Sequence, residues 1–396
     1  MDPAALKESW ALVAKSGDEV PMFFYSHLFV SHPELRPMFP ISMATQRDRL
    51  VGALGRIVSN ADQLDEVVGF IQQLGRDHRR FSVVTEHYAA VGASLLATLK
   101  HFLGAAWTPE LAADWSAAYG LIANTMVQAA EAAAEETPDW WEAEVLSVER
   151  RTLDLAVIKV QTNDHLPYRA GQSMAVEVPQ RPRLWRYLTP ANAPKDNGVV
   201  EFHVQLVDGG QVSTSIVRHL KPGDQIKMGA AIGDQLTRPE DRDRDLLMVA
   251  GGSGLAPLRA VLEEIDVEYQ ATGAAPKVHL LHGVRVPWNL YEHQLLTWLS
   301  QRDWFSYTPV VSDDQTYPGR RGLVGTVAAR DAEIDGRLAM VCGSPGMVQH
   351  TVTELTEAGL PPEQIRYENF ETHAPEATSA TATVTPAQTP LTGSER

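Results

Sequence analysis

The sequence has a single cysteine, fewer basic than acidic residues, and no long uninterrupted apolar run. Cys342 is the only cysteine in 396 residues, so an internal disulfide is excluded and a reducing compartment is favoured. The 34 lysines and arginines are outnumbered by 50 aspartates and glutamates. The resulting net charge of −16 argues against nucleic acid or an anionic membrane surface as a partner.

Two further absences concern targeting. Glycines and prolines interrupt the most apolar stretches, so we expect no segment that spans a bilayer. The first residues, Met1-Asp2-Pro3-Ala4, are acidic and lack the apolar core of a secretion signal, which predicts a cytoplasmic protein.

The chain is too long for one hydrophobic core, and its patterns predict three folded parts. Residues 1–136 have apolar residues at helical spacing and predict an all-α domain. After the linker at 137–139, residues 139–237 contain short strand-like segments separated by turns, which predict an antiparallel β-barrel. Residues 244–370 alternate strand and helix and predict a doubly wound α/β domain. Residues 371–396 lack aromatics and are rich in Thr, Ala and Pro, so we expect a disordered tail.

Two glycine clusters in the last part follow apolar runs that look like buried parallel strands. The first cluster is Gly251, Gly252, Ser253, Gly254, Leu255, Ala256 and Pro257, and the second begins at Cys342 and Gly343. A strand that turns through glycines into a helix presents bare N–H groups and the positive end of the helix dipole to a pyrophosphate. A lone Gly-x-Gly more often serves a tight turn, but two such turns at one sheet edge predict a dinucleotide site and a redox enzyme.

The pair of turns resembles the ferredoxin-reductase family, in which a flavin barrel precedes a nicotinamide domain. The resemblance implies that Glu368 and Phe370 belong to the segment that covers the flavin ring, and that Cys342 lies near the nicotinamide. The alternative for Cys342 is a small buried apolar residue.

The same resemblance assigns two flavin-binding segments, Arg186-Tyr187-Leu188-Thr189 and Gly210-Gln211-Val212-Ser213. Leu188 replaces the tyrosine with which the family contacts the ring, and Tyr187 faces the opposite side of a strand. Ser173 stands where the family often has an aromatic residue. We expect FAD to bind less tightly than usual, and a barrel that has lost its flavin is the alternative.

In the helical part, His78 is followed by Phe81 and Tyr88, and Tyr25 and Phe39 precede it. This block resembles a globin, and the order of the three parts over residues 1–370 resembles the flavohaemoglobins. The resemblance implies that His78 is the axial ligand of haem b and that Phe39 wedges the haem. It places Tyr25, Gln46 and Leu50 on the distal side, although Tyr25 could also be a core tyrosine and Gln46 a surface residue.

Two departures from the family lie on the proximal side. The His–Tyr–Glu relay of the family is matched by His78 and Tyr88, but its glutamate position falls on Ala130, with Glu131 one residue away. The residue before the histidine is Asp77 instead of a lysine, and we expect repulsion if it faces Glu368.

The resemblance implies a nitric oxide dioxygenase in which NAD(P)H reduces FAD, FAD reduces haem, and nitric oxide reacts with O₂ to give nitrate. NADH is slightly preferred over NADPH, because an arginine at 285 is as plausible on the surface as at a 2′-phosphate. Two alternatives stay open: an oxidoreductase with a different electron donor or acceptor, and a haem sensor that its own reductase resets. The oligomeric state is not readable from the sequence.

Overall fold

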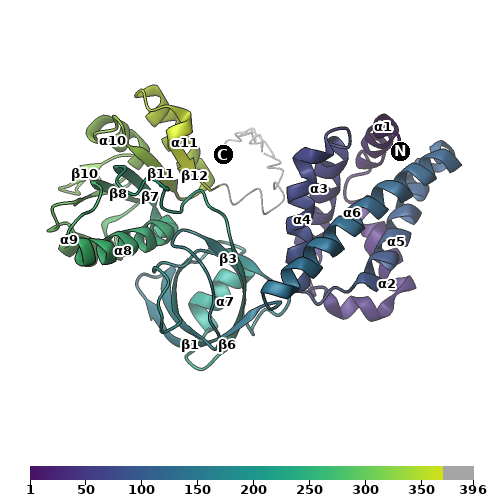
Figure 1. The fold of residues 1–396 in the computed structure, drawn as a ribbon, viewed down its shortest axis with the longest axis horizontal. Helices are drawn as coiled ribbons and strands as arrows, with labels where there is room; N and C mark the ends of the chain where they lie inside the picture. The colour runs from purple at the N-terminus through teal and green to yellow at the C-terminus, as the bar shows by residue number, and fades with distance from the viewer. Residues whose placement is uncertain (369–396) are drawn as a thin grey trace, which may run out of the picture.

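The computed structural model describes residues 1–368, which form three bodies along the chain (Figure 1). Phe370 and the predicted tail at 371–396 lie outside the described residues. We call the three bodies the helical domain (residues 3–136), the barrel domain (141–232) and the sheet domain (246–367).

The helical domain consists of α1 (Pro3–Ala14), α2 (Glu19–Ser31), the 3₁₀-helix η1 (Pro33–Met38), α3 (Ala44–Ser59), α4 (Leu64–Arg79), α5 (Thr85–Leu103), η2 (Gly104–Ala106) and α6 (Pro109–Glu136). Its helices begin at favourable residues: Asp2 accepts a hydrogen bond from the Ala4 N–H at 2.9 Å, and Thr108 caps α6 just before Pro109. Pro33 and Pro37 restrict the connection between α2 and α3 to the short η1.

Helix α5 corrects the expectation that no apolar segment is long enough for a membrane. Residues Thr85–Ala106 are long and apolar enough to cross a membrane, judged by length and composition alone. Leu95, Thr98 and Leu99 are buried, and α5 packs against α2 and α6. In this structure the segment is therefore a core helix of the helical domain.

The barrel domain is one antiparallel sheet in the order β4-β3-β6-β1-β2-β5. Its elements are β1 (Trp141–Arg150), β2 (Leu155–Thr162), β3 (Ser173–Glu177), β4 (Arg186–Leu188), β5 (Val199–Gln205), α7 (Gln211–His219) and β6 (Gln225–Ile232). A bridge between Pro190 and Phe202 joins the two edge strands and closes the barrel. Val212, Ile216 and Val217 of α7 are buried in the barrel core.

The sheet domain has six parallel strands in the order β10-β9-β8-β7-β11-β12. Its elements are β7 (Leu246–Gly251), η3 (Gly252–Gly254), α8 (Leu255–Thr272), β8 (Val278–Val284), η4 (Pro287–Asn289), α9 (His293–Leu299), β9 (Phe305–Val311), β10 (Arg320–Arg321), α10 (Val324–Asp331), β11 (Leu338–Cys342), α11 (Pro345–Glu357), η5 (Pro362–Gln364) and β12 (Ile365–Tyr367). Apolar cores lie on both faces, one under α8 and α9 and the other under α10 and α11. Cys342 pairs with Ala250, so both glycine turns lie at the same edge of the sheet.

Candidate functional site

His78 lies in the last turn of α4, where α4 packs closely against α6. Gly75, one turn earlier, makes this approach possible, because a Cβ there would lie 2.7 Å from the Cα of Met126. The Nδ1 of His78 donates a hydrogen bond to the carbonyl of Leu74 at 2.6 Å, which leaves Nε2 with its lone pair. Burial lowers the pKa of His78. The side chain is therefore a neutral imidazole with one ring nitrogen held by the backbone, the form that ligates iron.

Tyr25 of α2 is a buried hydroxyl donor close to the start of α3. Its hydroxyl donates to the backbone carbonyl of Gln46 at 3.4 Å, and its ring centre lies 5.6 Å from that of Phe39. Burial raises the pKa of Tyr25 far above the usual range, so the hydroxyl keeps its proton at physiological pH. The structure thus brings two of the three predicted distal residues, Tyr25 and Gln46, together with Phe39.

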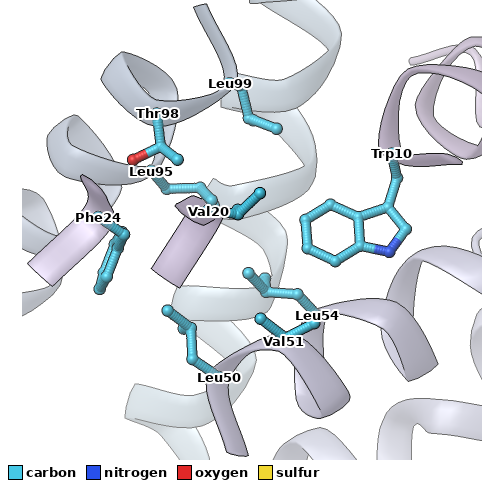
Figure 2. A pocket seen from close by; sticks show the side chains of 9 residues that line it. All are labelled: Trp10, Val20, Phe24, Leu50, Val51, Leu54, Leu95, Thr98 and Leu99. Carbon is cyan, nitrogen blue, oxygen red and sulfur yellow. The ribbon is translucent and has the colours of Figure 1, made fainter. Parts of the chain in front are cut away.

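Leu50, the third predicted distal residue, faces a small apolar cavity between α1, α2, α3 and α5. Figure 2 shows Leu50, Val51 and Leu54 of α3 directed toward the side chains of α1, α2 and α5. A second apolar cavity of about 210 Å³ shares Leu54 and Leu95 with the first and extends between α3, α4 and α6. Ile71 lines it on α4, two turns before His78.

These residues fit a haem. Among the described residues no group of three or more His, Cys, Asp and Glu side chains could hold a bare metal ion. A porphyrin supplies four ligands itself and needs one neutral imidazole and apolar walls from the protein. His78 offers the imidazole, and the cavity between α3, α4 and α6, which extends along α4 to Ile71, offers apolar walls.

The predicted proximal relay is not assembled at its glutamate. Glu131 is exposed on α6, whereas Met126 and Ala129 face the core, because one residue turns the helix by about 100°. Glu131, the candidate for the relay glutamate, is therefore not positioned to complete the relay in this structure. Tyr88 packs with Leu74 and Ile71, and within residues 1–368 its hydroxyl makes no hydrogen bond to His78.

The end of α4 contacts the barrel domain, and we call this contact the seam. The Tyr187 hydroxyl donates to the Asp77 carboxylate at 3.1 Å and accepts a hydrogen bond from Arg80 at 3.3 Å. Arg80 also pairs with Asp77 at 3.2 Å and lies over the rings of Tyr187 and Trp185. Tyr187 therefore binds the helical domain, on the side of β4 away from the barrel core in which Leu188 packs.

This geometry corrects the expected repulsion between Asp77 and Glu368. Asp77 is neutralised by Arg80, which directly follows its helix, and Glu368 accepts a hydrogen bond from Ser173 at 3.1 Å in the barrel. Neither residue could be placed from sequence, since Asp77 lies 110 positions before Tyr187 and Ser173 lies 195 positions before Glu368.

Ser173, Thr189 and Glu368 form a polar cluster at the barrel rim. The hydroxyls of Ser173 and Thr189 are 2.9 Å apart. Burial raises the pKa of Glu368 to about 7, although the hydrogen bond from Ser173 acts in the opposite direction. The cluster offers hydroxyl donors beside a carboxyl that can hold a proton, as a flavin edge requires. Ser173, read in sequence only as a departure, is thus a polar member of this site.

Glu368 predicts a pH dependence of stability. Because its folded pKa of about 7 exceeds the usual 4.5, its contribution is complete below pH 4.5 and is lost as the pH rises through 7. Glu368→Gln, which mimics the protonated acid, should match the wild type near pH 5 and unfold at a higher temperature above pH 7.5. Thermal unfolding followed at both pH values checks this. The exposed Glu363→Gln is the control, and equal melting of the wild type and Glu368→Gln at high pH would contradict the prediction.

The second predicted flavin segment starts helix α7. Val212 is buried in the barrel core, so this residue offers its backbone rather than its side chain. Ser213 donates to the Gly210 carbonyl at 3.3 Å and accepts from the Val207 N–H. The first N–H groups of a helix have no partner within it, so the start of α7 suits a phosphate. Arg186 on β4 is the cation predicted for the same group; burial lowers its pKa.

The glycine turns meet as the sequence predicts. A Cβ on Gly254 would lie 2.5 Å from the carbonyl carbon of Cys342, so the two turns touch through bare backbone. Leu255, Ala256 and Pro257 are buried under the sheet where α8 begins, so a ligand at this edge meets backbone rather than their side chains. Burial raises the pKa of Cys342 to about 12, and Glu368 adds to this, so the thiol is neutral. The cradle fits a dinucleotide pyrophosphate.

A buried ionic network between the barrel and sheet domains was not found from sequence. Glu201 of β5 binds His203 and Arg259, each at 3.0 Å, and Arg259 also pairs with Glu292 at 3.4 Å. Burial alone would raise the pKa of Glu201, but His203 and Arg259 lower it to about 2. The sequence does contain a signal for this network, because Glu201 and His203 alternate with apolar residues on a strand that is buried on both faces.

Comparisons with known proteins agree with this division. The globin family model matches residues 22–126, the oxidoreductase FAD-binding domain 142–235, and the oxidoreductase NAD-binding domain 248–353. A flavohemoprotein from Bacillus subtilis is 25% identical over 393 residues, which cover 92% of this chain and 95% of that protein. The predicted fold class and the haem, FAD and NAD cofactors are thereby confirmed.

Two further relatives differ in what they cover. The structure of a flavohemoglobin from Malassezia yamatoensis with bound FAD and heme has the same fold, with a TM-score of 0.73 at 18% identity over 92% of this chain and 97% of that one. The reductase component of phenol 2-monooxygenase from Pseudomonas sp. is 31% identical over 224 residues, 55% of this chain and 62% of that protein.

Proposed function

We propose a function from the premise that this chain belongs to the flavohaemoglobins, in which a globin is fused to an FAD- and NAD-binding reductase. Its domains support electron transfer from NAD(P)H through FAD to haem. We infer that it is a nitric oxide dioxygenase, which uses O₂ to convert nitric oxide to nitrate, and that it works in the cytoplasm. The observation that carries the proposal is Tyr25, a buried hydroxyl donor in the apolar core of the domain that presents the neutral His78.

When bound, the haem supplies the iron at which O₂ and nitric oxide react, and FAD splits the hydride of NAD(P)H into single electrons. The protein contributes position and electrostatics. The Tyr25 hydroxyl can donate a hydrogen bond to negative charge that develops beside it. The low-dielectric surroundings strengthen this hydrogen bond. Phe39 and Leu50 keep water away from that hydroxyl. The hydrogen bond from His78 Nδ1 to the Leu74 carbonyl fixes the orientation of the imidazole ring.

In the sheet domain, the two glycine turns touch each other and bind the nucleotide phosphates through their backbone N–H groups. Ser173 and Thr189 orient the flavin edge, and Glu368 beside them holds a proton that its raised pKa makes available near neutrality.

The proposal is tested by supplying purified protein with NADH, O₂ and nitric oxide and measuring nitrate. Stoichiometric nitrate and continuous NADH consumption are expected. A companion measurement adds NADH to the protein under carbon monoxide without O₂, and the Soret band should shift to that of the ferrous carbonyl complex. A Soret band that stays oxidised would contradict the internal electron route.

Tyr25→Phe removes the distal donor while keeping the ring. We expect nitric oxide turnover to fall by about 10- to 100-fold, because a charge-assisted hydrogen bond in a dry site is lost, and we expect faster O₂ release. Stopped-flow O₂ dissociation and nitrate yield measure both. The control is Tyr168→Phe in the barrel, which likewise loses a buried hydroxyl bonded to a backbone carbonyl, that of Asn192. Unchanged O₂ release in Tyr25→Phe would show that Tyr25 is only a core residue.

NADH is the nucleotide we favour. Arg285 after β8, the candidate for a 2′-phosphate, pairs with Asp313 at 2.8 Å. The carboxylate offsets the charge that a 2′-phosphate needs. The ratio of kcat/KM for NADH to that for NADPH should therefore exceed one.

A second candidate is a haem and flavin oxidoreductase with another electron donor or acceptor. It is favoured by the departure at Leu188 and by the similarity of the reductase part to a component that serves a different enzyme. Slow nitrate formation together with rapid flavin reduction by another donor would select this candidate.

A further inference from the structure

Three arginines from three elements converge at the seam. Arg49 lies on α3, Arg80 directly follows α4, and Arg186 lies on β4. Arg49 lies within reach of the other two charges, since its pKa is lowered first by its burial and then by the charges of Arg186 and Arg80. Mutual repulsion between partly buried guanidinium groups is unfavourable unless an anion lies among them.

Arg49 lacks such an anion within the described part of the chain. Its Nε is buried without a hydrogen-bond partner, and across residues 1–368 the side chain forms no ion pair. Buried arginines are almost always paired. The Nε of Arg80 is also buried without a partner.

Asp77 does not meet this need. It is the one carboxylate among residues 1–368 that acts appreciably on Arg49, and it already binds Arg80 at 3.2 Å and the Tyr187 hydroxyl at 3.1 Å. Because Asp77 is already engaged by Arg80 and Tyr187, Arg49 needs a further negative group.

The position of the arginines indicates which group. Arg49 is three residues after Gln46 and next to Leu50, and Arg80 is two residues after His78, so both flank the haem pocket. Haem b carries two propionate carboxylates on one edge, and a guanidinium matches a carboxylate with two parallel hydrogen bonds.

We propose that Arg49 and Arg80 form a carboxylate site that binds a haem propionate at the seam, where Tyr187 of the barrel domain accepts a hydrogen bond from Arg80, so that the helical and barrel domains hold the haem together. The inference rests on the haem-binding part of the proposed function.

The test measures haem loss from the full-length holoprotein to excess apomyoglobin, followed by absorbance. Wild type, Arg49→Gln and Arg49→Lys are each prepared with haem b and with its dimethyl ester, which lacks both carboxylates. Arg49→Gln should lose haem b about tenfold faster or more, because a charge-assisted hydrogen bond disappears, and Arg49→Lys should be intermediate. With the ester, the variants and the wild type should lose the group equally fast. Arg76→Gln, an exposed arginine on α4, is the matched control and should change neither rate.

Three results would overturn the inference. Equal acceleration with haem b and its ester would show that Arg49 only packs. Faster FAD release with unchanged haem loss would assign the site to the flavin phosphates. Unchanged release of both groups would show that no carboxylate is bound. A wild type without any Soret band would also overturn the haem assignment of the proposed function, whereas the other results leave it intact.

Discussion

Replacing His78 with alanine should leave a protein that contains FAD but almost no haem. The imidazole is the one neutral nitrogen ligand that α4 presents, with Nδ1 fixed by the Leu74 carbonyl at 2.6 Å. Without it the apolar walls alone must retain the porphyrin, and haem content per chain should fall about tenfold or more. Reduction of FAD by NADH should be unchanged, since the flavin and nucleotide sites lie in the other two domains.

The haem-to-flavin absorbance ratio of purified His78→Ala measures this outcome. Added imidazole should restore a Soret band, because a free ring can enter the space of the deleted side chain. His101→Gln is the control, as His101 is exposed on α5, where its ring stacks on Phe23 and meets the ring of Phe102 edge to face. Full haem content in His78→Ala would show that another residue holds the iron.

Gly254→Ala should nearly abolish electron transfer from the nicotinamide nucleotide to FAD. The new Cβ would lie 2.5 Å from the Cys342 carbonyl carbon, and backbone on both sides cannot yield as a flexible side chain does. The two turns must separate, and the N–H groups that bind pyrophosphate lose their alignment. We expect the apparent Kd for NADH to rise about 100-fold, equivalent to a few kcal/mol of lost binding free energy.

Stopped-flow bleaching of the flavin over a range of NADH concentrations measures the Kd and the limiting rate separately. Gly346→Ala is the matched control, since a Cβ at that glycine of α11 meets no atom within 4 Å. Circular dichroism confirms that the variant folds. An unchanged Kd would mean that the nucleotide does not use this edge of the sheet.

Local features were predictable from the sequence, and contacts between distant segments were not. The glycine turns and their strands could be read because each turn, with its strand and helix, lies within one short segment, such as 246–257. Helix α7 was missed because the glycines before it and its hydroxyl residues are typical of a loop, although Val212 and Ile216 have helical spacing.

The sequence was misleading for contacts between two domains, and for a residue whose side of a helix changes with a shift of one position. Whether Asp77 faces Glu368 or Tyr187 depends on how α4 docks on β4, and no local pattern encodes that docking. Glu131 was assigned by proximity in sequence to the relay position, yet a single step around α6 places it in solvent. That Arg49 lacks a negatively charged partner becomes visible only once the side chains around it are known.

The connection between the helical and barrel domains has a kinetic consequence. Helix α6 ends at Glu136 and β1 begins at Trp141, so residues 137–140 span at most about 14 Å. Arg79 further ties this connection to α4, with hydrogen bonds to Thr137 and an ion pair with Asp139 at 3.1 Å. An electron donor and acceptor joined this closely meet at an effective concentration in about the millimolar range. Delivery of electrons to the haem is then first order in this chain. Turnover per molecule should be insensitive to dilution, whereas a separate reductase and its acceptor would slow as both become scarce.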